Sequence, residues 1–497
     1  MTSTTTALPL TPENLAAIGE RVPVPGYDRS QVTPGIVHLG VGGFHRAHQA
    51  MYLDRLMNEG KALDWGIRGI GVLPHDRRMK EVMDAQGGLY TLVLKDPDGS
   101  REPRVIGSIL DFILAPEDTE GAVEAMADPR IRIVSLTVTE GGYNIDAVSG
   151  EFVLTEEKVA ADLADGAVPQ TSFGLVTEAL RRRRDRGIPP FTVMSCDNIQ
   201  GNGHVAHQVF VAFAKAKDAE LGTWIDEHVK FPNCMVDRIT PGTTDDDRAE
   251  VREAFGVEDA WPVVCEPFVQ WVLEDDFGLG RPPYEDAGVQ VVDDVEPYEL
   301  MKLRLLNASH QALCYFGYLA GYRLVHEVAQ DPLFATFLLG YMEREGSPTL
   351  APVPGIDLDA YRHELVSRFS NGEVRDTVAR LCNESSDRIP KWLLPVVRHQ
   401  IAHGGEFFRA AAVVASWARY AEGVDEQGEQ IEVSDRIADR LVATAQRNRT
   451  DPTAFIADRA LFGDLVDDEA FVAEYTATLA SLHAHGARAT LEAIVAR

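Results

Sequence analysis

The fold of this chain is decided by the stretch Ile36-Val37-His38-Leu39-Gly40-Val41-Gly42-Gly43-Phe44-His45-Arg46-Ala47-His48. The order of residue types predicts a β-strand, then a glycine turn, then a helix over residues 44–58. Gly40 and Gly42 supply a G-x-G pair, and glycine at these places lets the backbone approach a pyrophosphate closely. The helix would direct its free N–H groups and its positive end at the same anion. The stretch therefore predicts a dinucleotide-binding turn.

The turn departs from the common dinucleotide fingerprint at one place. The third glycine of that fingerprint would fall at position 45, where this chain has His45. A glycine turn that joins a strand to a helix and binds nothing is the alternative interpretation. The acidic residue that binds the ribose should follow the second strand, predicted at residues 67–72, and Asp76 stands there. Its carboxylate favours NAD because it repels a 2′-phosphate, whereas the basic residues beside it leave NADP open.

The first 295 residues alternate apolar runs of β type with helical patterns, which indicates an α/β domain with a mostly parallel sheet. Strands are predicted at 35–39, 67–72, 90–94, 131–138, 191–194, 235–239 and 263–266. Helices are predicted between them at 44–58, 116–127, 173–186, 203–216 and 246–255. Beyond Asp293-Asp294 the pattern is helical throughout. Two domains are therefore expected: a Rossmann-type NAD-binding domain over 1–295, and a mainly α-helical substrate and catalytic domain over 296–497.

Length and composition indicate a soluble, cytoplasmic, two-domain protein. The chain has 497 residues, more than one hydrophobic core normally supports. Its formal net charge of −30 argues against nucleic acid and anionic membrane surfaces as partners. The sequence shows no export signal and no apolar run long enough to span a membrane. The five cysteines are scattered, which fits a reducing compartment and argues against a Cys-rich zinc site, so no metal is expected.

A second stretch carries the candidate chemistry: Lys302-Leu303-Arg304-Leu305-Leu306-Asn307-Ala308-Ser309-His310. It is predicted to lie on one helix over residues 298–324. At about 100° per residue, Asn307 lies about 140° from Lys302 and His310 about 80°, so the three share one broad face. Burial lowers the pKa of a lysine, which makes Lys302 a candidate base near neutral pH. The alternative is a lysine that reaches water beside a satisfied core Asn and His.

Four further motifs accompany the glycine turn and the lysine helix. They are Thr137-Val138-Thr139-Glu140-Gly141-Gly142-Tyr143, Ser195-Cys196-Asp197-Asn198 with Gly201-Asn202-Gly203, Val236-Asp237-Arg238-Ile239-Thr240-Pro241, and Glu266-Pro267-Phe268 with Gln270-Trp271. Together these motifs resemble the polyol-specific long-chain dehydrogenases, and the likeness spans most of the chain. The resemblance implies an N-terminal Rossmann-type domain, a mainly helical C-terminal domain, an active site in the cleft between them, and chemistry that needs no zinc.

The resemblance also implies roles for the catalytic residues. Lys302 would be the general base. Asn198 and Asn307 would hydrogen-bond the developing alkoxide, and His310 would bind and orient a substrate hydroxyl. Glu299 would belong to a proton path to solvent; its alternative is an ion pair or a carboxylate at a helix start. In physical terms, a base takes the alcohol proton while amide donors stabilise the charge left on oxygen.

Substrate and cofactor contacts follow from the same resemblance. Asp237 would contact polyol hydroxyls, with a salt bridge to Arg238 as the alternative. Arg380 and Arg388 would belong to the substrate pocket, although residues 383–387 match the family less well and an arginine on a helix usually faces solvent. The cofactor, NAD, would contact Gly40, Gly42, Gly43, Phe44, Arg46, Asp76, Thr139, Glu140 and Gly141.

The function that the resemblance implies is NAD-dependent oxidation of a D-polyol at a secondary alcohol, first of all D-mannitol to D-fructose and the reverse. Alternatives in the same family are a hexuronate reductase acting on D-mannonate and D-fructuronate, and a D-arabinitol or D-sorbitol dehydrogenase. Arg380, Arg388 and Lys391 would serve the carboxylate of a hexonate. A non-catalytic NAD-binding sensor is a remote alternative, because a sensor has no reason to keep the Lys, Asn and His set. The expected partners are a small polyol or sugar, and the expected state is a monomer or a weak homo-oligomer.

Overall fold

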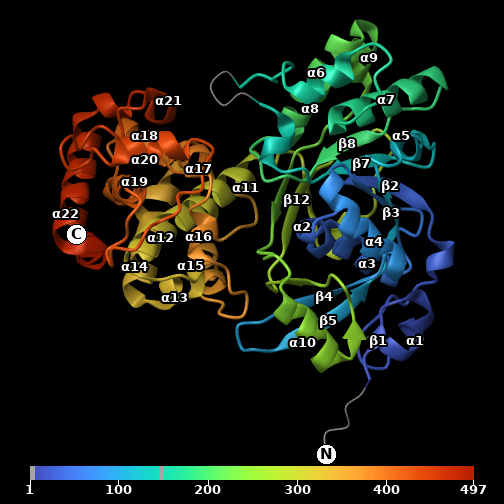
Figure 1. Cartoon of the computed structure of the whole chain (residues 1–497), viewed down its shortest axis with the longest axis horizontal. Helices are drawn as coiled ribbons and strands as arrows, with labels where there is room; N and C mark the ends of the chain where they lie inside the picture. The colour runs from blue at the N-terminus through green and yellow to red at the C-terminus, as the bar shows by residue number, and fades with distance from the viewer. Residues whose placement is uncertain (1–5, 146–149) are drawn as a thin grey trace, which may run out of the picture. The chain divides into compact units, whose positions relative to one another are not determined.

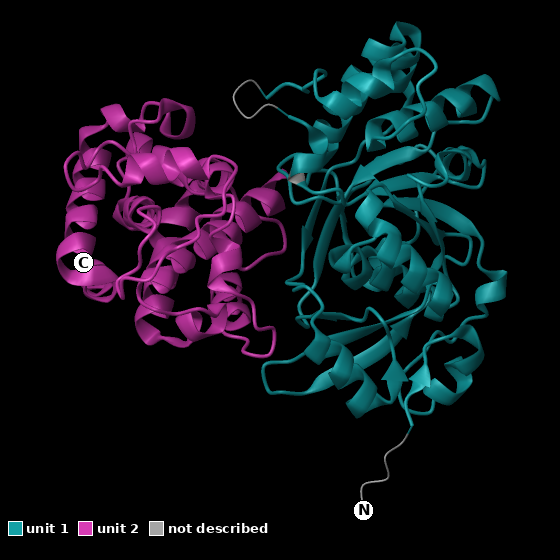
Figure 2. Ribbon diagram, viewed as in Figure 1, with its two compact units in different colours: residues 1–295 teal, residues 296–497 magenta. Residues whose placement is uncertain are grey.

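The structure is a computed structural model that describes residues 6–145 and 150–497 of the chain. The chain forms two compact units, Met1–Val295 and Glu296–Arg497, which Figure 2 colours separately. The first unit is built from β-sheets with helices around them, and the second is mainly helical (Figure 1).

A five-stranded parallel sheet forms the centre of the first unit. Its strand order is β6-β3-β2-β7-β8, and every neighbouring pair is parallel. The strands are β6 (Ile109–Leu114), β3 (Gly66–Gly71), β2 (Pro34–Leu39), β7 (Ile133–Leu136) and β8 (Thr192–Ser195). The strand order reverses between β2 and β7, and the carboxyl ends of strands at such a switch point are where open α/β sheets bind ligands. The predicted Rossmann-type parallel sheet is confirmed.

Both faces of this sheet are covered by helices. Along β2, Ile36 belongs to one buried cluster, whereas Val37 and Leu39 belong to another on the opposite face. The first cluster includes residues of α3 (Gln49–Asn58) and α4 (Arg77–Gln86). The second includes residues of α5 (Thr119–Ala127), α7 (Ser172–Asp185) and α8 (Asn202–Lys217). Burial on both sides explains the near-continuous apolar sequence of these strands.

Three of the predicted strands, those at 90–94, 235–239 and 263–266, lie in two separate mixed sheets. β4 (Tyr90–Lys95) pairs in parallel with β11 (Val263–Cys265) and antiparallel with β5 (Arg101–Ile106). β9 (Cys234–Asp237) pairs antiparallel with β12 (Gln270–Glu274), which pairs in parallel with β13 (Gln290–Val292). The sequence pattern did not predict β5, in which charged residues and a proline interrupt the apolar signal that marks a strand.

The helix predicted over residues 44–58 is two helices. α2 (Gly43–Ala47) ends before His48, and α3 begins after it. His48 has φ −123° and ψ −93°, which is not helical, and its Nε2 lies 2.9 Å from the carbonyl oxygen of Gln270. The break is therefore held by a contact with β12, far along the chain.

The second unit is a set of packed helices around one that is fully buried. α19 (Phe408–Tyr420) is buried from Arg409 to its end and packs against α22 (Glu469–Val495) and α12 (Ala308–Leu319). The other α-helices are α11 (Glu296–Met301), α13 (Val325–Gln330), α14 (Pro332–Tyr341), α15 (Leu358–Phe369), α16 (Val378–Leu381), α17 (Ser385–Trp392), α18 (Leu394–His403), α20 (Ala438–Ala445) and α21 (Arg459–Phe462). The mainly helical C-terminal region predicted from the sequence is confirmed.

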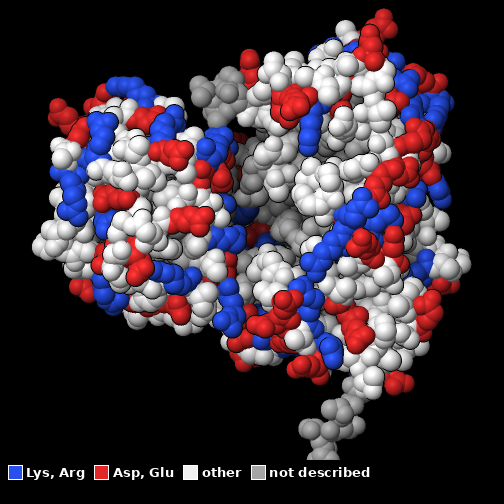
Figure 3. Space-filling model, in the orientation of Figure 1, with Lys and Arg blue, Asp and Glu red and all other residues white. Residues whose placement is uncertain are grey.

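On the face shown in Figure 3, acidic and basic side chains are interspersed, so the formal charge of −30 does not form a single acidic patch there. Across residues 6–145 and 150–497, none of the helices combines the length and the apolar character that crossing a membrane requires.

Candidate active site

The glycine turn after β2 leaves open space above its backbone. Gly40 has φ +91°, and a Cβ there would lie 2.2 Å from the carbonyl oxygen of Thr137. Only glycine fits that position. A Cβ on Gly42 would meet nothing closer than the Gly40 carbonyl oxygen at 3.9 Å, and one on Gly43 only the Thr240 methyl group at 3.7 Å. The open space lies where α2 begins, so it can hold an anion.

His45 occupies the third-glycine position without a clash. Its ring is 1 % exposed and stacks on the ring of His38 from β2, with centroids 3.4 Å apart and an angle of 11°. The nitrogens of His38 lie 2.8 Å from Ser135 Oγ and 2.9 Å from Thr137 Oγ1. Burial lowers the pKa of His38 to about 3 and that of His45 well below its ordinary value. Both rings are therefore neutral, and their stack supplies the close helix–strand packing that a third glycine normally allows.

Arg46 lies beneath the turn and is 1 % exposed. Its Nη1 donates to the carbonyl oxygen of Trp261 at 2.5 Å, and its own carbonyl accepts from the Tyr90 hydroxyl at 2.5 Å. Burial lowers the pKa of Arg46 to about 10. These contacts tie the turn to the β4–β11 sheet. Phe44, also predicted to contact the cofactor, stacks on His48 with a centroid distance of 5.0 Å.

Asp76 lies between β3 and α4, at the carboxyl end of the sheet. One carboxylate oxygen accepts from the backbone N–H of Leu73 at 2.9 Å, and the side chain is 26 % exposed. His75 Nε2 lies 3.8 Å from the Asp76 carboxylate, whereas the two arginines that follow have other partners. Arg77 forms an ion pair with Glu117, and the Arg78 guanidinium lies 4.8 Å from the centre of the Trp261 ring.

The loop after β7 is held by a carboxylate that the sequence reasoning left without a role. Asp197 accepts from the N–H groups of Val138 at 3.1 Å and Thr139 at 2.8 Å, and from the Tyr143 hydroxyl at 2.8 Å. Thr139 has φ +67° and ψ 164°, a conformation that L residues rarely adopt, so these bonds hold a strained backbone. Asn198 follows Asp197 directly and is exposed. A carboxylate three residues after the strand predicted at 191–194 was the available signal.

The loop continues through residues 140 and 141, where cofactor contacts were predicted, and leaves space around its backbone at Gly141. Glu140 begins the short 3₁₀ turn Glu140–Tyr143, and a Cβ on Gly141 would meet nothing within 4 Å.

Asp237, predicted to contact the substrate, lies at the end of β9 and is 5 % exposed. The neighbouring Arg238 donates to the carbonyl oxygens of Ala47 at 2.7 Å and Glu266 at 3.1 Å.

In the second unit, the lysine stretch is not an α-helix. Residues Lys302–Asn307 form a π-helical turn between α11 and α12, and the Ala308 N–H bonds to the Leu303 carbonyl five residues earlier. In a π turn the residue five positions along takes the place that the fourth takes in an α-helix. Asn307 therefore lies one turn above Lys302 on the same face. The sequence estimate of about 140° between them, which assumed α-helical geometry, is wrong.

The π turn and the α-helices on either side of it carry buried polar side chains. Lys302 is 7 % exposed, Glu299 8 % and Asn307 4 %. Within the described part of the chain, Asn307 Nδ2 and His310 Nε2 are buried and have no hydrogen-bond partner. Buried polar atoms are nearly always satisfied, so two orphans on one helix face indicate a site for a polar ligand.

His310 is neutral, and basic groups surround it. Its pKa lies well below the ordinary value, first because of burial and then because of the positive charges of Arg380, Arg368, Arg388 and Lys302. Its ring packs on Phe369 with a centroid distance of 4.6 Å.

Both arginines predicted for the substrate pocket already have partners. Arg380 donates to the two carboxylate oxygens of Asp376 at 2.6 and 2.5 Å. Arg388 donates to the Leu381 carbonyl at 3.1 Å, and Lys391 pairs with Asp387 at 2.8 Å.

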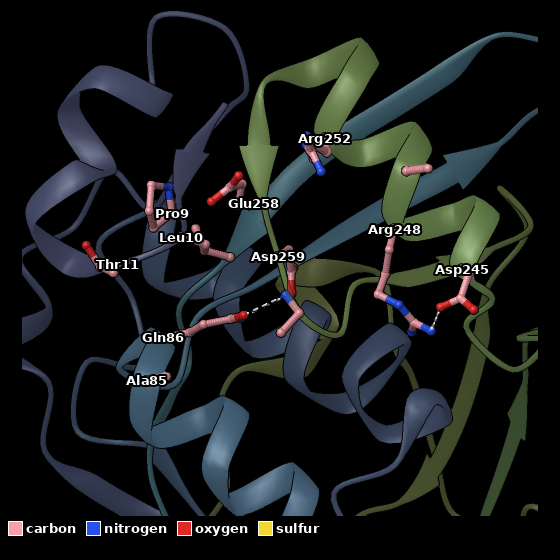
Figure 4. A pocket seen from close by; sticks show the side chains of 12 residues that line it. Pro9, Leu10, Thr11, Ala85, Gln86, Asp245, Arg248, Arg252, Glu258 and Asp259 are labelled. Atoms are coloured by element: carbon pink, nitrogen blue, oxygen red, sulfur yellow. Dashed lines mark hydrogen bonds and ion pairs between the residues drawn. The ribbon is translucent and has the colours of Figure 1, made fainter. Parts of the chain in front are cut away.

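A separate hollow of about 530 Å³ lies in the first unit and shares no residue with the predicted sites (Figure 4). It is lined by the N-terminal segment, the end of α4 and α10 (Asp245–Phe255). Its buried carboxylate, Asp259, already accepts from the N–H groups of Thr91 and Trp261 and from Gln86. We assign no function to this hollow. In the described ranges, no group of three or more His, Cys, Asp or Glu side chains is placed to hold a metal ion.

Comparison with known proteins identifies the family. Residues 34–286 match the model of the mannitol dehydrogenase Rossmann domain, and residues 294–483 match the mannitol dehydrogenase C-terminal domain. A mannitol 2-dehydrogenase of Phaeosphaeria nodorum is 45 % identical over 97 % of this chain and 85 % of its own length. One from Pyricularia oryzae is 43 % identical over 98 % of this chain and 99 % of its own.

Two solved structures share the fold over nearly the whole chain. The Pseudomonas fluorescens mannitol 2-dehydrogenase, a ternary complex with NAD and D-mannitol, has a TM-score of 0.92 and 46 % identity, covering 99 % of this chain and 100 % of that one. A D-sorbitol dehydrogenase in substrate-free form has a TM-score of 0.88 and 39 % identity, covering 97 % and 100 %. The chain therefore belongs to the mannitol dehydrogenase family.

Proposed function

We propose that this protein is an NAD-dependent mannitol 2-dehydrogenase that oxidises D-mannitol to D-fructose and catalyses the reverse reduction. One observation supports the proposal most: the π turn Lys302–Asn307 sets a lysine and an amide one turn apart, and among the described residues Asn307 Nδ2 and His310 Nε2 are buried without a hydrogen-bond partner. The family relationship supplies the reaction class, because the similar chains carry the name mannitol 2-dehydrogenase and one was solved with NAD and D-mannitol.

The first unit fits the cofactor. The open space over Gly42 and Gly43, at the start of α2, suits a pyrophosphate. Asp76 has a half-exposed carboxylate that suits the ribose hydroxyls, and Arg77 and Arg78 are engaged elsewhere, so the end of β3 favours NAD over NADP. Thr139, Glu140 and Gly141 form the facing loop. We assign Arg46 to holding the turn from below.

The second unit supplies the acid–base chemistry. NAD, when bound, is the two-electron acceptor for the carbon that is oxidised. Lys302 Nζ takes the proton of the substrate hydroxyl. Asn307 Nδ2 donates to the same oxygen and stabilises its growing negative charge, and we assign Asn198 the second amide donor. His310 binds a neighbouring hydroxyl through Nε2, and Glu299 passes the proton onward from Lys302.

Substrate selection rests on hydrogen bonds to hydroxyl groups. Asp237 accepts from polyol hydroxyls, and Arg380 and Arg388 shape the pocket around His310. Because Arg380 is already bonded to Asp376 and Arg388 to a backbone carbonyl, a polyol suits this pocket better than a hexonate, whose carboxylate needs a basic partner of its own.

All five cysteines are buried and unbridged, which supports a reducing cytoplasm as the compartment. We expect a monomer or a weak homo-oligomer.

The test is a substrate comparison with purified protein. NADH formation is measured by absorbance with D-mannitol, D-arabinitol, D-sorbitol and D-mannonate side by side, and NADH consumption is measured with D-fructose. The proposal predicts the highest kcat/KM for D-mannitol. A preference for D-mannonate would keep the fold and the lysine chemistry but contradict the polyol assignment.

A further inference from the structure

The π turn leaves one backbone carbonyl to be satisfied from outside the helix. The Ala308 N–H donates to the Leu303 carbonyl five residues earlier and is shared with the Leu305 carbonyl. At the end of the π turn the backbone hydrogen bonds change from spanning five residues to spanning four, as in an α-helix, and one carbonyl there receives no backbone N–H. That carbonyl is the one after Leu303, which belongs to Arg304. That oxygen accepts a hydrogen bond from the Tyr341 hydroxyl at 3.0 Å. A side chain thus replaces the missing backbone donor.

Two further contacts from the same segment reach the middle of the turn. A Cβ on Gly346 would lie 2.8 Å from Leu305 Cδ2 and 3.3 Å from the Arg304 carbonyl oxygen, so a larger residue there would force the Leu305 side chain and the turn to shift. The Arg304 guanidinium donates to the carbonyl oxygen of Thr349 at 2.5 Å. Residues 341–349 therefore contact both the backbone and the side chains of the π turn Lys302–Asn307.

This segment is itself firmly anchored. Tyr341 ends α14 and is fully buried, and burial raises the pKa of its hydroxyl well above the ordinary value, so the hydroxyl remains a donor. A second π turn, Met342–Gly346, follows at once. In that turn the buried Glu345 carboxylate accepts from the N–H groups of Arg409 and Ala410 at 2.8 Å each, at the start of the buried helix α19. The support of the lysine turn therefore reaches the core of the unit.

We infer that Tyr341 is a positioning residue for the reaction: its hydrogen bond to the Arg304 carbonyl fixes the π register that places Asn307 one turn above Lys302. The inference rests on the proposed function. In an α-helical register the Ala308 N–H would bond to Arg304, and Asn307 would turn to about 140° from Lys302. The proton acceptor and the amide donor would then no longer point at one oxygen. Tyr341 touches no substrate and acts through the turn.

The test removes the hydroxyl alone, by Tyr341→Phe. The matched control is Tyr298→Phe, which removes a hydroxyl that donates to the Pro354 carbonyl at 2.8 Å in the same unit but outside the turn. Both variants lose one hydrogen bond of similar kind, so similar falls in thermal midpoint are expected. At a temperature well below both midpoints, kcat for D-mannitol should fall at least about tenfold in Tyr341→Phe and stay within about twofold in Tyr298→Phe, with NADH affinity unchanged in both.

A kinetic isotope effect separates positioning from simple loss of folded protein. With mannitol deuterated at the oxidised carbon, the isotope effect on kcat in Tyr341→Phe should equal or exceed that of the wild type, because the chemical step is the one slowed. A smaller isotope effect, or equal kcat in the two tyrosine variants, would overturn the inference. Gly346→Ala adds a methyl group against the Leu305 side chain of the same turn and should also lower kcat. This second variant keeps the test decisive if Tyr341→Phe does not fold. Wild-type protein without mannitol activity would instead refute the proposed function.

Discussion

At the scale of single residues, helical pitch decides which side chains can act together. Lys302 and Asn307 are five positions apart, a spacing that separates them by about 140° in an α-helix but aligns them in a π turn. His310 follows Asn307 by three residues of ordinary α-helix, so it stays on a neighbouring strip of the same face. The orphaned nitrogens of Asn307 and His310 are the chemical sign that this face binds a ligand.

Replacing Asn307 by alanine should lower kcat for D-mannitol by roughly 10²–10³-fold, because a donor to the developing alkoxide is lost. The matched control is Ser309→Ala, whose hydroxyl is also buried and without a partner among the described residues but lies about 160° around the helix from Asn307, off the face that Asn307 and His310 share. That variant should change kcat by less than about threefold. Steady-state kinetics on both variants decide the matter, and a loss below about threefold in Asn307→Ala would remove the alkoxide role.

Asp76 should determine cofactor choice. Asp76→Ala removes the charge that repels a 2′-phosphate, so the ratio of kcat/KM for NADP to that for NAD should rise by roughly tenfold or more, about 1.4 kcal/mol. Asp84→Ala is the control, since this carboxylate pairs with Lys80 on the exposed side of α4, the helix that follows Asp76. If the ratio moves equally in both variants, the effect comes from general charge and Asp76 does not contact the ribose.

At the scale of elements, the two π turns of the second unit support each other, and a buried carboxyl belongs to this arrangement. Burial raises the pKa of Glu345 from its ordinary value of 4.5 to about 7. Between these values the folded protein holds a proton that the unfolded chain has released. The contribution of Glu345 to stability therefore falls as pH rises from about 4.5 to about 7, by on the order of 3 kcal/mol, and is constant above.

Glu345→Gln should remove this pH dependence while keeping an oxygen that accepts from the start of α19. The thermal midpoint of the variant minus that of the wild type should become more positive between about pH 5 and about pH 8. Glu343→Gln, an exposed carboxyl in the same turn, serves as the control and should show no such change. A difference that does not vary with pH would show that Glu345 is ionised throughout this range.

At the scale of the whole molecule, local pattern predicted most of the architecture. Apolar runs predicted four of the five strands of the parallel sheet because those strands are buried on both faces, as β7 is, whereas β6, which carries Asp111 and is only partly buried, was not predicted. The glycine turn was predictable because Gly40 must have positive φ and its neighbours must leave space. The catalytic candidates of the second unit were found because a lysine, an amide and an imidazole are unusual in so apolar a helix.

What the sequence did not predict depends on contacts between distant residues. β4 and β9 read as strands of the parallel sheet, but their partners, β5 and β12, place them in mixed sheets. The stacking of His45 on His38 and the π register of Lys302–Asn307 have no local signature either. The register depends on Tyr341 and Gly346, some forty residues along the chain, and the helix 44–58 breaks at His48, whose ring contacts β12.

The central claim is that Lys302 is the proton acceptor in NAD-dependent mannitol oxidation. The most direct measurement is kcat of Lys302→Ala with D-mannitol and NAD, together with NADH affinity by fluorescence titration. Lys391→Ala, an exposed lysine of the same unit paired with Asp387, is the control. The account predicts that Lys302→Ala loses roughly 10²–10⁴-fold in kcat, the usual contribution of a positioned base, with NADH affinity unchanged. Turnover near that of the wild type in Lys302→Ala would contradict it.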